Sequence, residues 1–499
     1  MRTTAVWICC CACLNCIGWL LSAIHQLNAA GYAVATLAGL GALWAWRRHT
    51  SAVLLPRIHW QPVRRRFGKF LPLMFLTVGL LEFLGGAIYA PNNYDGLTYR
   101  LPRMLNWLVA GHWFWIQSIN ERMNYSTAAW EWIAMPLLAI LRSDRSLFLI
   151  DIASFFLMPG LIFSVFRRLG VARKAAWNWM WIFPLAFGYA TQAGSIGNDL
   201  TGTVFALASV CFGLRARSPG KVQDIWLAGL AAALMTGVKL SNAPLVLPCL
   251  VAVWPALPQL RKQWITSVAV AAVAVLASAA PIMVLNQVET GSWTGDPANA
   301  SQIQIRSHGA ALLGNSLLLA QQCFMPPVLP GARKIDDSLN KSLPAGWQKT
   351  LQIKFPRYHL NHLNELPQEE TAGLGLGVTI LLLAGVAGMV CRAGKNISTK
   401  NHSLATALVG YAACGAALFY MLKMGSEATA RLMLPYYPLA VVPILMSPAQ
   451  GWLSASRVWK WFAAVAALGV LPAVILSPSR PLFPLPVVER FLEHHPENA

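Results

Sequence analysis

The chain has 499 residues, of which 56% are hydrophobic and only 12% are charged. Because soluble domains carry about 25% charged residues, this composition excludes an ordinary soluble protein and predicts an integral membrane protein. The net charge is +20, but Lys and Arg lie in short clusters between apolar runs, a pattern typical of loops that face anionic lipid. We therefore expect no binding to nucleic acid.

Apolar stretches recur along the whole chain, and a membrane-spanning helix needs about 20 such residues. The stretches lie at 5–24, 29–46, 71–90, 127–141, 147–166, 175–195, 200–214, 224–257, 265–285, 371–391, 403–422, 432–447 and 460–477. They predict an all-α polytopic membrane protein with about 11–13 transmembrane helices. We interpret the first stretch as an uncleaved span. Its five cysteines are either small apolar side chains packed in a helix or sites of acylation near the membrane surface.

Basic clusters separate these stretches and predict which loops face the cytoplasm. They are Arg47–Arg48, Arg57 to Lys69, Arg167 to Lys174, Arg215 to Lys221, Arg261–Lys262 and Arg392 to Lys400. The positive-inside rule then places 91–126 and 286–370 on the outer side. If 127–141 and 147–166 both crossed the membrane, the cluster at 167–174 would lie outside, so we expect 127–141 to enter and return on one side.

This pattern divides the chain into four parts. They are an N-terminal helical hairpin with a basic cytoplasmic loop (1–70), a transmembrane core that holds the first large outer loop at 91–126 (71–285), a second large outer loop (286–370), and C-terminal transmembrane helices with a short tail (371–499).

A carboxylate stands at the outer mouth of the span that ends near residue 90. The chain holds only 19 Asp and Glu, so the placement of each acid is informative. Asp95 is surrounded in sequence by Tyr94, Tyr99, Arg100 and Arg103. A carboxylate can take the proton of a hydroxyl, and guanidinium groups match phosphate oxygens in a bidentate way. The segment therefore predicts chemistry on an anionic lipid headgroup at the membrane surface.

Residues 97–108 place apolar side chains at near-helical spacing, with Arg100 and Arg103 on another face. This predicts an amphipathic juxtamembrane helix in the first outer loop. Two interpretations stay open. The helix is an interfacial anchor whose arginines extend to the headgroups, or one of the arginines holds a phosphate.

Further ionisable residues fall at predicted span mouths or within apolar runs, where such residues are expensive and usually functional. Those predicted on the outer face are Glu121, Glu131, Asp199, Glu369, Glu370, Glu427 and Arg431, and Lys239 lies within an apolar run. Asp199 could instead cap a helix, and Lys239 could extend to the surface. We interpret Glu82 and Asp151 as polar contacts between helices.

Five segments, in order, resemble the GT-C class of integral-membrane glycosyltransferases, and within it the superfamily of protein O-mannosyltransferases and aminoarabinose transferases. The segments are NNYDGLTYRLPRMLNWL, NDLTGTVFALASVCF, GVKL, EETAGLGLG and ARLMLPYYPL. They are similar to the superfamily's first-loop pattern D-x-x-x-Y-H/R-x-P-R, its N-D-L span start, its T-K-L turn, its E-D-x-x-G entry to a late span and its R-Y-L-L-P-x-x-P element. The late acidic motif departs, since Glu369 and Glu370 precede Thr371 where E-D is typical.

The resemblance implies transfer of a sugar from a polyprenyl-phosphate donor to a hydroxyl of a glycolipid, polysaccharide or protein, with inversion. Asp95 would be the general base. Arg100, Arg103, Lys239 and Arg431 would be candidates for the donor phosphate, and Tyr94, Tyr99, Glu131, Asp199, Glu369 and Glu370 would shape the pocket. The outer loop has one acid rather than an acidic pair, which leaves a divalent metal ion open. The expected location is the bacterial inner membrane, with the site facing the periplasm.

Two other functions stay open. A transporter or flippase for lipid-linked saccharides would place ionisable groups on both faces of a central cavity. A polymerase or ligase of another fold would use the loop at 286–370, with His359, His362 and Arg306 as candidates.

Overall fold

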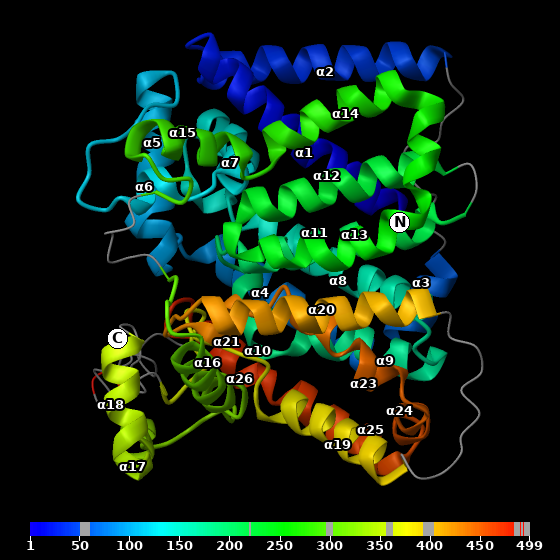
Figure 1. Cartoon of the computed structure of the whole chain (residues 1–499), viewed down its shortest axis with the longest axis vertical. Helices are drawn as coiled ribbons and strands as arrows, with labels where there is room; N and C mark the ends of the chain where they lie inside the picture. Colours follow the sequence, from blue (N-terminus) through cyan, green and yellow to red (C-terminus); the bar gives the residue numbers. More distant parts are fainter. Residues whose placement is uncertain are drawn as a thin grey trace.

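In the computed structural model the chain is a bundle of helices (Figure 1). The structure describes residues 1–49, 60–218, 221–295, 303–355, 363–392 and 404–483, with positions 490 and 493. Within these ranges there is no β-strand, and an isolated bridge joins Gln304 to Met424. The predicted all-α class is confirmed.

Seven helical segments of the described chain are long and apolar enough to cross a membrane. They are α1 (Arg2–Ala23), α4 (Phe70–Ile88), Asp144–Arg168 with α8 (Leu149–Arg168), α11 (Asp199–Ala216), Leu240–Ala277 with α13 (Val246–Val253) and α14 (Trp264–Ala277), Thr406–Lys423 in α20 (Leu404–Lys423), and Arg457–Ile475 with α25 (Arg457–Leu468) and α26 (Val470–Ile475). The predicted polytopic membrane protein is confirmed, and the number of 11–13 spans stays a prediction.

The remaining helices are shorter or less apolar. They are α2 (Ala29–His49), α3 (Trp60–Phe67), α5 (Leu101–Ala110), α6 (Arg122–Tyr125), α7 (Ala129–Leu141), α9 (Arg173–Ile182), α10 (Phe187–Ala193), α12 (Val222–Val238), α15 (Ala280–Thr290), α16 (His308–Cys323), α17 (Ala332–Ser342), α18 (Ala345–Lys354), α19 (Leu376–Arg392), α21 (Thr429–Leu432), α22 (Tyr437–Ala440), α23 (Val442–Met446) and α24 (Pro448–Leu453).

Helix α11 forms the centre of the bundle. Its apolar window is 94% buried, against 33–61% for the other spans, and it packs against α8, α12 and α13. Small residues make this close packing feasible, as they do between membrane helices generally. A Cβ atom at Gly202 would lie 2.7 Å from Asn242 Nδ2, and one at Gly213 would lie 3.1 Å from Ala252 Cβ.

The two ends of the bundle differ in chemistry. Helices α3 and α9 and the N-terminus lie at one end, whereas α5, α6, α15, α17 and α18 lie at the other (Figure 1). At the first end, Arg66 and Lys69 stand over the ring of Trp177. The two predicted outer loops thus share one end, and described basic clusters lie at the opposite end, as the sequence predicts. Residues 57–59, 219–220 and 393–400 of the basic clusters lie outside the described residues.

Both termini of helix α7 lie on the side of the bundle that holds α5. Just before it, the carbonyl of Thr127 accepts a hydrogen bond from Arg103 of α5. Just after it, Arg145 donates to the carbonyl of Ile88, the last residue of α4, at 3.4 Å. The segment has 13 helical residues and returns to the side on which it starts, which agrees with the prediction for 127–141.

The first outer loop is helical, but its arginines face inward. A π-helical turn (Gly96–Arg100) leads into α5, which ends at Gly111 with φ +75°, a conformation that favours glycine. Arg100 and Arg103 are each 1% exposed, while Leu105 is 50% exposed. The interpretation as an anchor with arginines at headgroup level is therefore wrong. The apolar side chains of this helix can face lipid, whereas buried carboxylate and carbonyl oxygens accept the hydrogen bonds of the two arginines.

Candidate active site

Asp95 immediately precedes the π-helical turn Gly96–Arg100, and its carboxylate is enclosed by guanidinium groups. Arg122 donates from Nη2 to Oδ1 at 2.8 Å, and Arg431 donates from Nη2 to Oδ2 at 3.1 Å. Arg100 Nη2 lies 3.9 Å from Oδ2. The side chain of Asp95 is buried. Both carboxylate oxygens are therefore engaged by cations in this structure.

Arg431, in the short helix α21, connects three carboxylates that are far apart in sequence. In addition to Asp95, its Nη1 pairs with Glu370 Oε2, and its Nε lies 3.6 Å from Asp199 Oδ2. Arg431 is itself buried. Since a buried cation requires compensating charge, these three acids hold the guanidinium at the centre of one ion network.

Asp199 and Lys239 extend this network into the core of the bundle. Lys239, which follows the last residue of α12, donates to Asp199 Oδ1 at 2.5 Å. Gln192 donates to the other carboxylate oxygen at 3.3 Å. The N-cap residue of α11 is Asn198 and not Asp199, and the Asp199 carboxylate accepts from the side chains of Lys239 and Gln192. The alternatives of a helix cap for Asp199 and a surface-seeking Lys239 are therefore wrong, because the two pair with each other.

Arg100 and Arg103 donate hydrogen bonds to backbone carbonyls of neighbouring segments. Arg103 donates to the carbonyls of Ser126 and Thr127, each at 2.7 Å, and pairs with Glu131. Arg100 donates to the carbonyl of Ile196 at 2.6 Å. Neither guanidinium lines the cavity described next. Their geometry suits them to fix the loop around Asp95, and it gives the predicted phosphate contact no surface on which to form.

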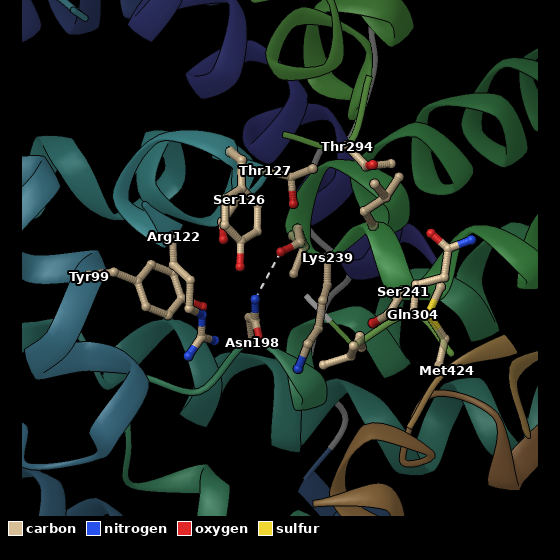
Figure 2. A pocket seen from close by; sticks show the side chains of 14 residues that line it. Tyr99, Arg122, Ser126, Thr127, Asn198, Lys239, Ser241, Thr294, Gln304 and Met424 are labelled. Atoms are coloured by element: carbon tan, nitrogen blue, oxygen red, sulfur yellow. Dashed lines mark hydrogen bonds between the residues drawn. The ribbon is translucent and has the colours of Figure 1, made fainter. Parts of the chain in front are cut away.

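A cavity of about 190 Å³ adjoins the network, and we call it the basic cavity. Its lining comprises Tyr99, Arg122, Tyr125, Ser126, Thr127, Asn198, Val238, Lys239, Leu240, Ser241, Thr294, Ile303, Gln304 and Met424. Figure 2 shows the side chains of Arg122 and Lys239 on either side of Asn198. The ring of Tyr99 lies 4.4 Å from the guanidinium carbon of Arg122. The cavity therefore offers two cations next to hydroxyl and amide groups.

A second cavity, of about 540 Å³, adjoins the network from the first outer loop. We call it the polar cavity. Its lining comprises Asn92, Asn93, Tyr94, Leu97, Thr98, Gln368, Glu369, Glu370, Pro478 and Ser479. Glu370 accepts a hydrogen bond from the backbone N–H of Tyr94 at 2.8 Å and pairs with Arg431. The ion network thus runs from one cavity to the other, through Arg122, Asp95, Arg431 and Glu370.

Glu369 belongs to a separate buried cluster. It accepts hydrogen bonds from Ser195 at 2.6 Å and from Arg480 at 3.2 Å. Arg480 also lies 3.6 Å from Glu82, in α4. The interpretation as a polar contact between helices is confirmed for Asp151 of α8, which accepts from Thr201 of α11 at 2.6 Å. It is wrong for Glu82, whose partners Arg480 and the N–H of Gly194 lie outside helices. Arg480 therefore ties the segment after α26 to the site.

The pKa of Asp95 results from two opposed effects. Burial raises the pKa, but the charges of Arg431, Arg122 and Arg100 outweigh burial and hold it well below its ordinary value. In this state Asp95 is an ionised and weakly basic carboxylate. An anion that draws the arginines toward itself would raise this pKa and make Asp95 a better base.

The donor atoms do not favour a metal ion. Among the described residues, no three His, Cys, Asp or Glu side chains form a group that could hold one. Asp95, Asp199, Glu131 and Glu370 are each paired with Lys or Arg. These carboxylates would have to leave their cations to bind a divalent ion, so the divalent metal stays a prediction without a fitting ligand set.

Sequence reasoning brought together part of this site and missed part of it. Asp95, Asp199, Lys239, Glu370 and Arg431 do converge, as predicted. Arg122, the second cation of the basic cavity, and Arg480 are not among the predicted site residues. Arg122 lies in the same predicted outer loop as Asp95, and that shared location is the signal that could have selected it. Tyr94 is exposed, and Tyr99 is buried against the arginines.

Part of the chain that carries the site is similar to a known family of proteins. The model of glycosyltransferase family 87 matches residues 131–329, a segment that holds Glu131, Asp199 and Lys239. The chain is a membrane glycosyltransferase. The match covers less than half of the chain, and the GT-C resemblance of the sequence agrees with it. No curated protein matches this glycosyltransferase in sequence.

Two solved structures are similar to this glycosyltransferase over much of its length. One is ArnT from Cupriavidus metallidurans in the apo state, with 16% identity, and the other is the same protein bound to undecaprenyl phosphate, with 15% identity. Each match has a TM-score of 0.35 and covers 81% of this chain and 78% of the other. At this TM-score the likeness carries no weight for the site.

Proposed function

We propose that this glycosyltransferase moves a sugar from a polyprenyl-phosphate donor to a hydroxyl acceptor, with inversion at the anomeric carbon. The observation that carries the proposal is the contact between Asp95 and the cations Arg122 and Arg431, at 2.8 and 3.1 Å, beside a cavity lined by Arg122 and Lys239. A carboxylate can take the acceptor proton and neighbouring cations can hold the donor phosphate, which suits glycosyl transfer from a phosphate ester.

In this proposal the donor phosphate binds in the basic cavity. Arg122 and Lys239 are partly exposed there, with side chains 24% and 17% accessible, whereas Arg100 and Arg103 are buried. The two exposed cations would bind phosphate oxygens with charge-assisted hydrogen bonds. Arg431 lies behind them, between Asp95 and Asp199, and would stabilise negative charge on the leaving phosphate.

Asp95 would act as the general base. The acceptor oxygen forms a bond to the anomeric carbon, the bond from that carbon to the phosphate oxygen breaks, and the hydroxyl proton passes to Asp95. Polyprenyl phosphate leaves with the electron pair of the broken bond. A single displacement of this kind inverts the anomeric centre.

The membrane setting favours a lipid-borne donor. The site lies at one end of a bundle of apolar helices (Figure 1), where a phosphate at the headgroup level of a lipid could enter with its chain in the bilayer. We place this end outside, on the periplasmic face of a bacterial inner membrane, because the basic clusters lie at the other end.

The transporter alternative fits the structure less well. It predicts ionisable groups on both faces of a central cavity, whereas the network of Asp95, Asp199, Lys239, Glu370 and Arg431 gathers at one end. For the polymerase alternative, His359 and His362 lie outside the described residues. Arg306 is exposed and lines neither cavity.

The test uses purified protein in lipid nanodiscs and radiolabelled polyprenyl-phosphate hexoses and pentoses. We expect release of polyprenyl phosphate together with a glycosylated lipid, polymer or protein from a membrane extract. Asp95→Asn should lower the rate of transfer about 10²- to 10⁴-fold while donor binding persists. Asp337→Asn, which neutralises an exposed acid of α17, is the matched control and should keep full activity.

A further inference from the structure

We propose that a third cavity, beside the exposed side of α5, binds a phospholipid whose headgroup carries both a phosphate and a primary ammonium group, as phosphatidylethanolamine does. The cavity has a volume of about 580 Å³ and lies between the start of α2, the helix α5 and the end of α7. We call it the lipid cavity. No residue of the ion network lines it, so this site is separate from the proposed sugar transfer and goes beyond it.

Two opposite charges line the lipid cavity without pairing with each other. Arg142 follows the last residue of α7, and Asp144 begins the short 3₁₀ helix that comes next. Within the described part of the chain, neither of these side chains forms an ion pair or a hydrogen bond. A guanidinium matches phosphate oxygens, and a carboxylate accepts hydrogen bonds from an ammonium group. The two free charges therefore match a headgroup that carries both signs.

The rest of the lining is suited to acyl chains. Leu101, Leu105, Leu108 and Val109 of α5 and Leu138 of α7 form apolar walls. Leu105 and Val109 are 50% and 90% exposed, so the protein covers this side of α5 incompletely. An interfacial helix with such an apolar face lies at the boundary between headgroups and acyl chains. A phospholipid would cover the exposed leucines and remove their apolar surface from water.

The charged part of the lipid cavity lies at the outer end of the membrane spans, where headgroups lie. Arg145, next to Asp144 in sequence, donates to the carbonyl of Ile88, the last residue of the span α4. The turn between α1 and α2 lies at the same end, because the N–H of Leu27 donates to the carbonyl of Gly111 after α5 at 2.9 Å. A lipid with its chains against α5 would therefore bring its headgroup to the two free charges.

The backbone provides an independent indication of a site at this corner of the protein. Among the described residues other than glycine, only His25 and Arg142 have positive φ angles, of 55° and 50°, and side chains with a Cβ atom disfavour this conformation. His25 lies in the turn that leads to Asn28 of the cavity lining. Glycine would adopt the conformation at the end of α7 without strain. An arginine held there despite the strain indicates that its guanidinium has a function.

The experiment measures binding of defined phospholipids to the delipidated full-length protein in detergent, by native mass spectrometry. The probes are phosphatidylethanolamine, phosphatidylglycerol and phosphatidylcholine with identical acyl chains, and undecaprenyl phosphate is the competitor. Arg142→Gly removes the guanidinium and relieves the backbone, and Asp144→Asn removes the charge of the carboxylate. Arg306→Gly and Asp337→Asn are the matched controls, since both change exposed residues that line none of the three cavities.

We expect wild-type protein to bind phosphatidylethanolamine about tenfold more tightly than the other two phospholipids, because only its primary ammonium donates a charged hydrogen bond to Asp144. Asp144→Asn should abolish the preference for phosphatidylethanolamine over phosphatidylglycerol. Arg142→Gly should weaken binding of both lipids about tenfold, and the melting temperature of the lipid-free protein should not fall, since glycine suits the positive φ. Both control variants should bind as wild type does.

Equal affinities of the wild-type protein for phosphatidylethanolamine and phosphatidylglycerol would overturn the assignment. So would an Arg142→Gly protein that binds phosphatidylethanolamine as tightly as wild type does. Displacement of phosphatidylethanolamine by an equimolar amount of undecaprenyl phosphate would also overturn it, since the cavity would then be a site for the donor lipid. The proposed sugar transfer is measured separately, and its failure would leave this lipid site standing.

Discussion

Replacement of Arg103 by Met tests whether this buried arginine is structural. Its guanidinium bonds to the carbonyls of Ser126 and Thr127 and pairs with Glu131, and both charged side chains are almost inaccessible. Arg103→Met leaves the Glu131 carboxylate buried without its main partner, a change that costs about 3–5 kcal/mol. We expect the free energy of unfolding to fall by about that amount, with donor affinity kept in the folded fraction.

The measurement is a denaturant titration in detergent, followed by tryptophan fluorescence. The signal is the summed fluorescence of the 21 tryptophans, and it includes Trp107, whose ring lies 5.5 Å from the Arg103 guanidinium carbon and stacks on Trp132. Arg103→Met combined with Glu131→Leu should recover at least about 1 kcal/mol of the loss, because the unpaired carboxylate is gone. An Arg103→Met protein as stable as wild type that fails to bind undecaprenyl phosphate would refute the reasoning and make Arg103 a phosphate ligand.

Three further predictions follow from the ion clusters. Lys239→Met should weaken binding of undecaprenyl phosphate about 10- to 100-fold, as expected for the loss of a charged hydrogen bond worth about 1.5–3 kcal/mol. Lys239→Arg should restore most of the lost affinity. Unchanged binding by both variants would exclude Lys239 from the donor site. Arg480→Leu should lower the free energy of unfolding by about 3–5 kcal/mol, because Glu82 and Glu369 lose their shared cation, and a denaturation curve that matches wild type would contradict this. The arginines hold the pKa of Asp95 below its ordinary value, so the stabilisation by its ionised form is present above about pH 4 and is lost only as pH falls through the lower folded pKa. Donor phosphate should raise that pKa, and in pH–rate profiles the acid limb of kcat should therefore lie at higher pH than the acid limb of kcat/KM; the reverse order would refute the coupling.

Composition and the order of motifs were sufficient for the class of fold and for every member of the ion network except Arg122. Acid is scarce in this chain, so Asp95 and Asp199 stand out, and the sidedness of basic loops places them together with Arg431 at one end. The pairing of Asp199 with Lys239 could not be predicted. It joins the first residue of α11 to the residue that follows α12, and no local sequence pattern encodes that contact.

The direction of the α5 arginines was predicted wrongly for a physical reason. Amphipathic spacing separates two faces but does not say which one is buried. At a membrane surface the apolar face of a helix can contact lipid, and its polar face can turn inward where buried carboxylates and carbonyls accept hydrogen bonds from it. Glu131 and the carbonyl of Ser126 are such acceptors for Arg103. Arg480 was missed because its partners, Glu82 and Glu369, lie far from it in sequence.

The central claim, that Asp95 is the base of the glycosyl transfer, is tested most directly by single-turnover transfer from a radiolabelled polyprenyl-phosphate sugar. Asp95→Asn keeps the shape of the side chain and removes its basicity. We predict a loss of about 10²- to 10⁴-fold in rate with donor affinity retained. A variant that transfers sugar at the wild-type rate would contradict the claim.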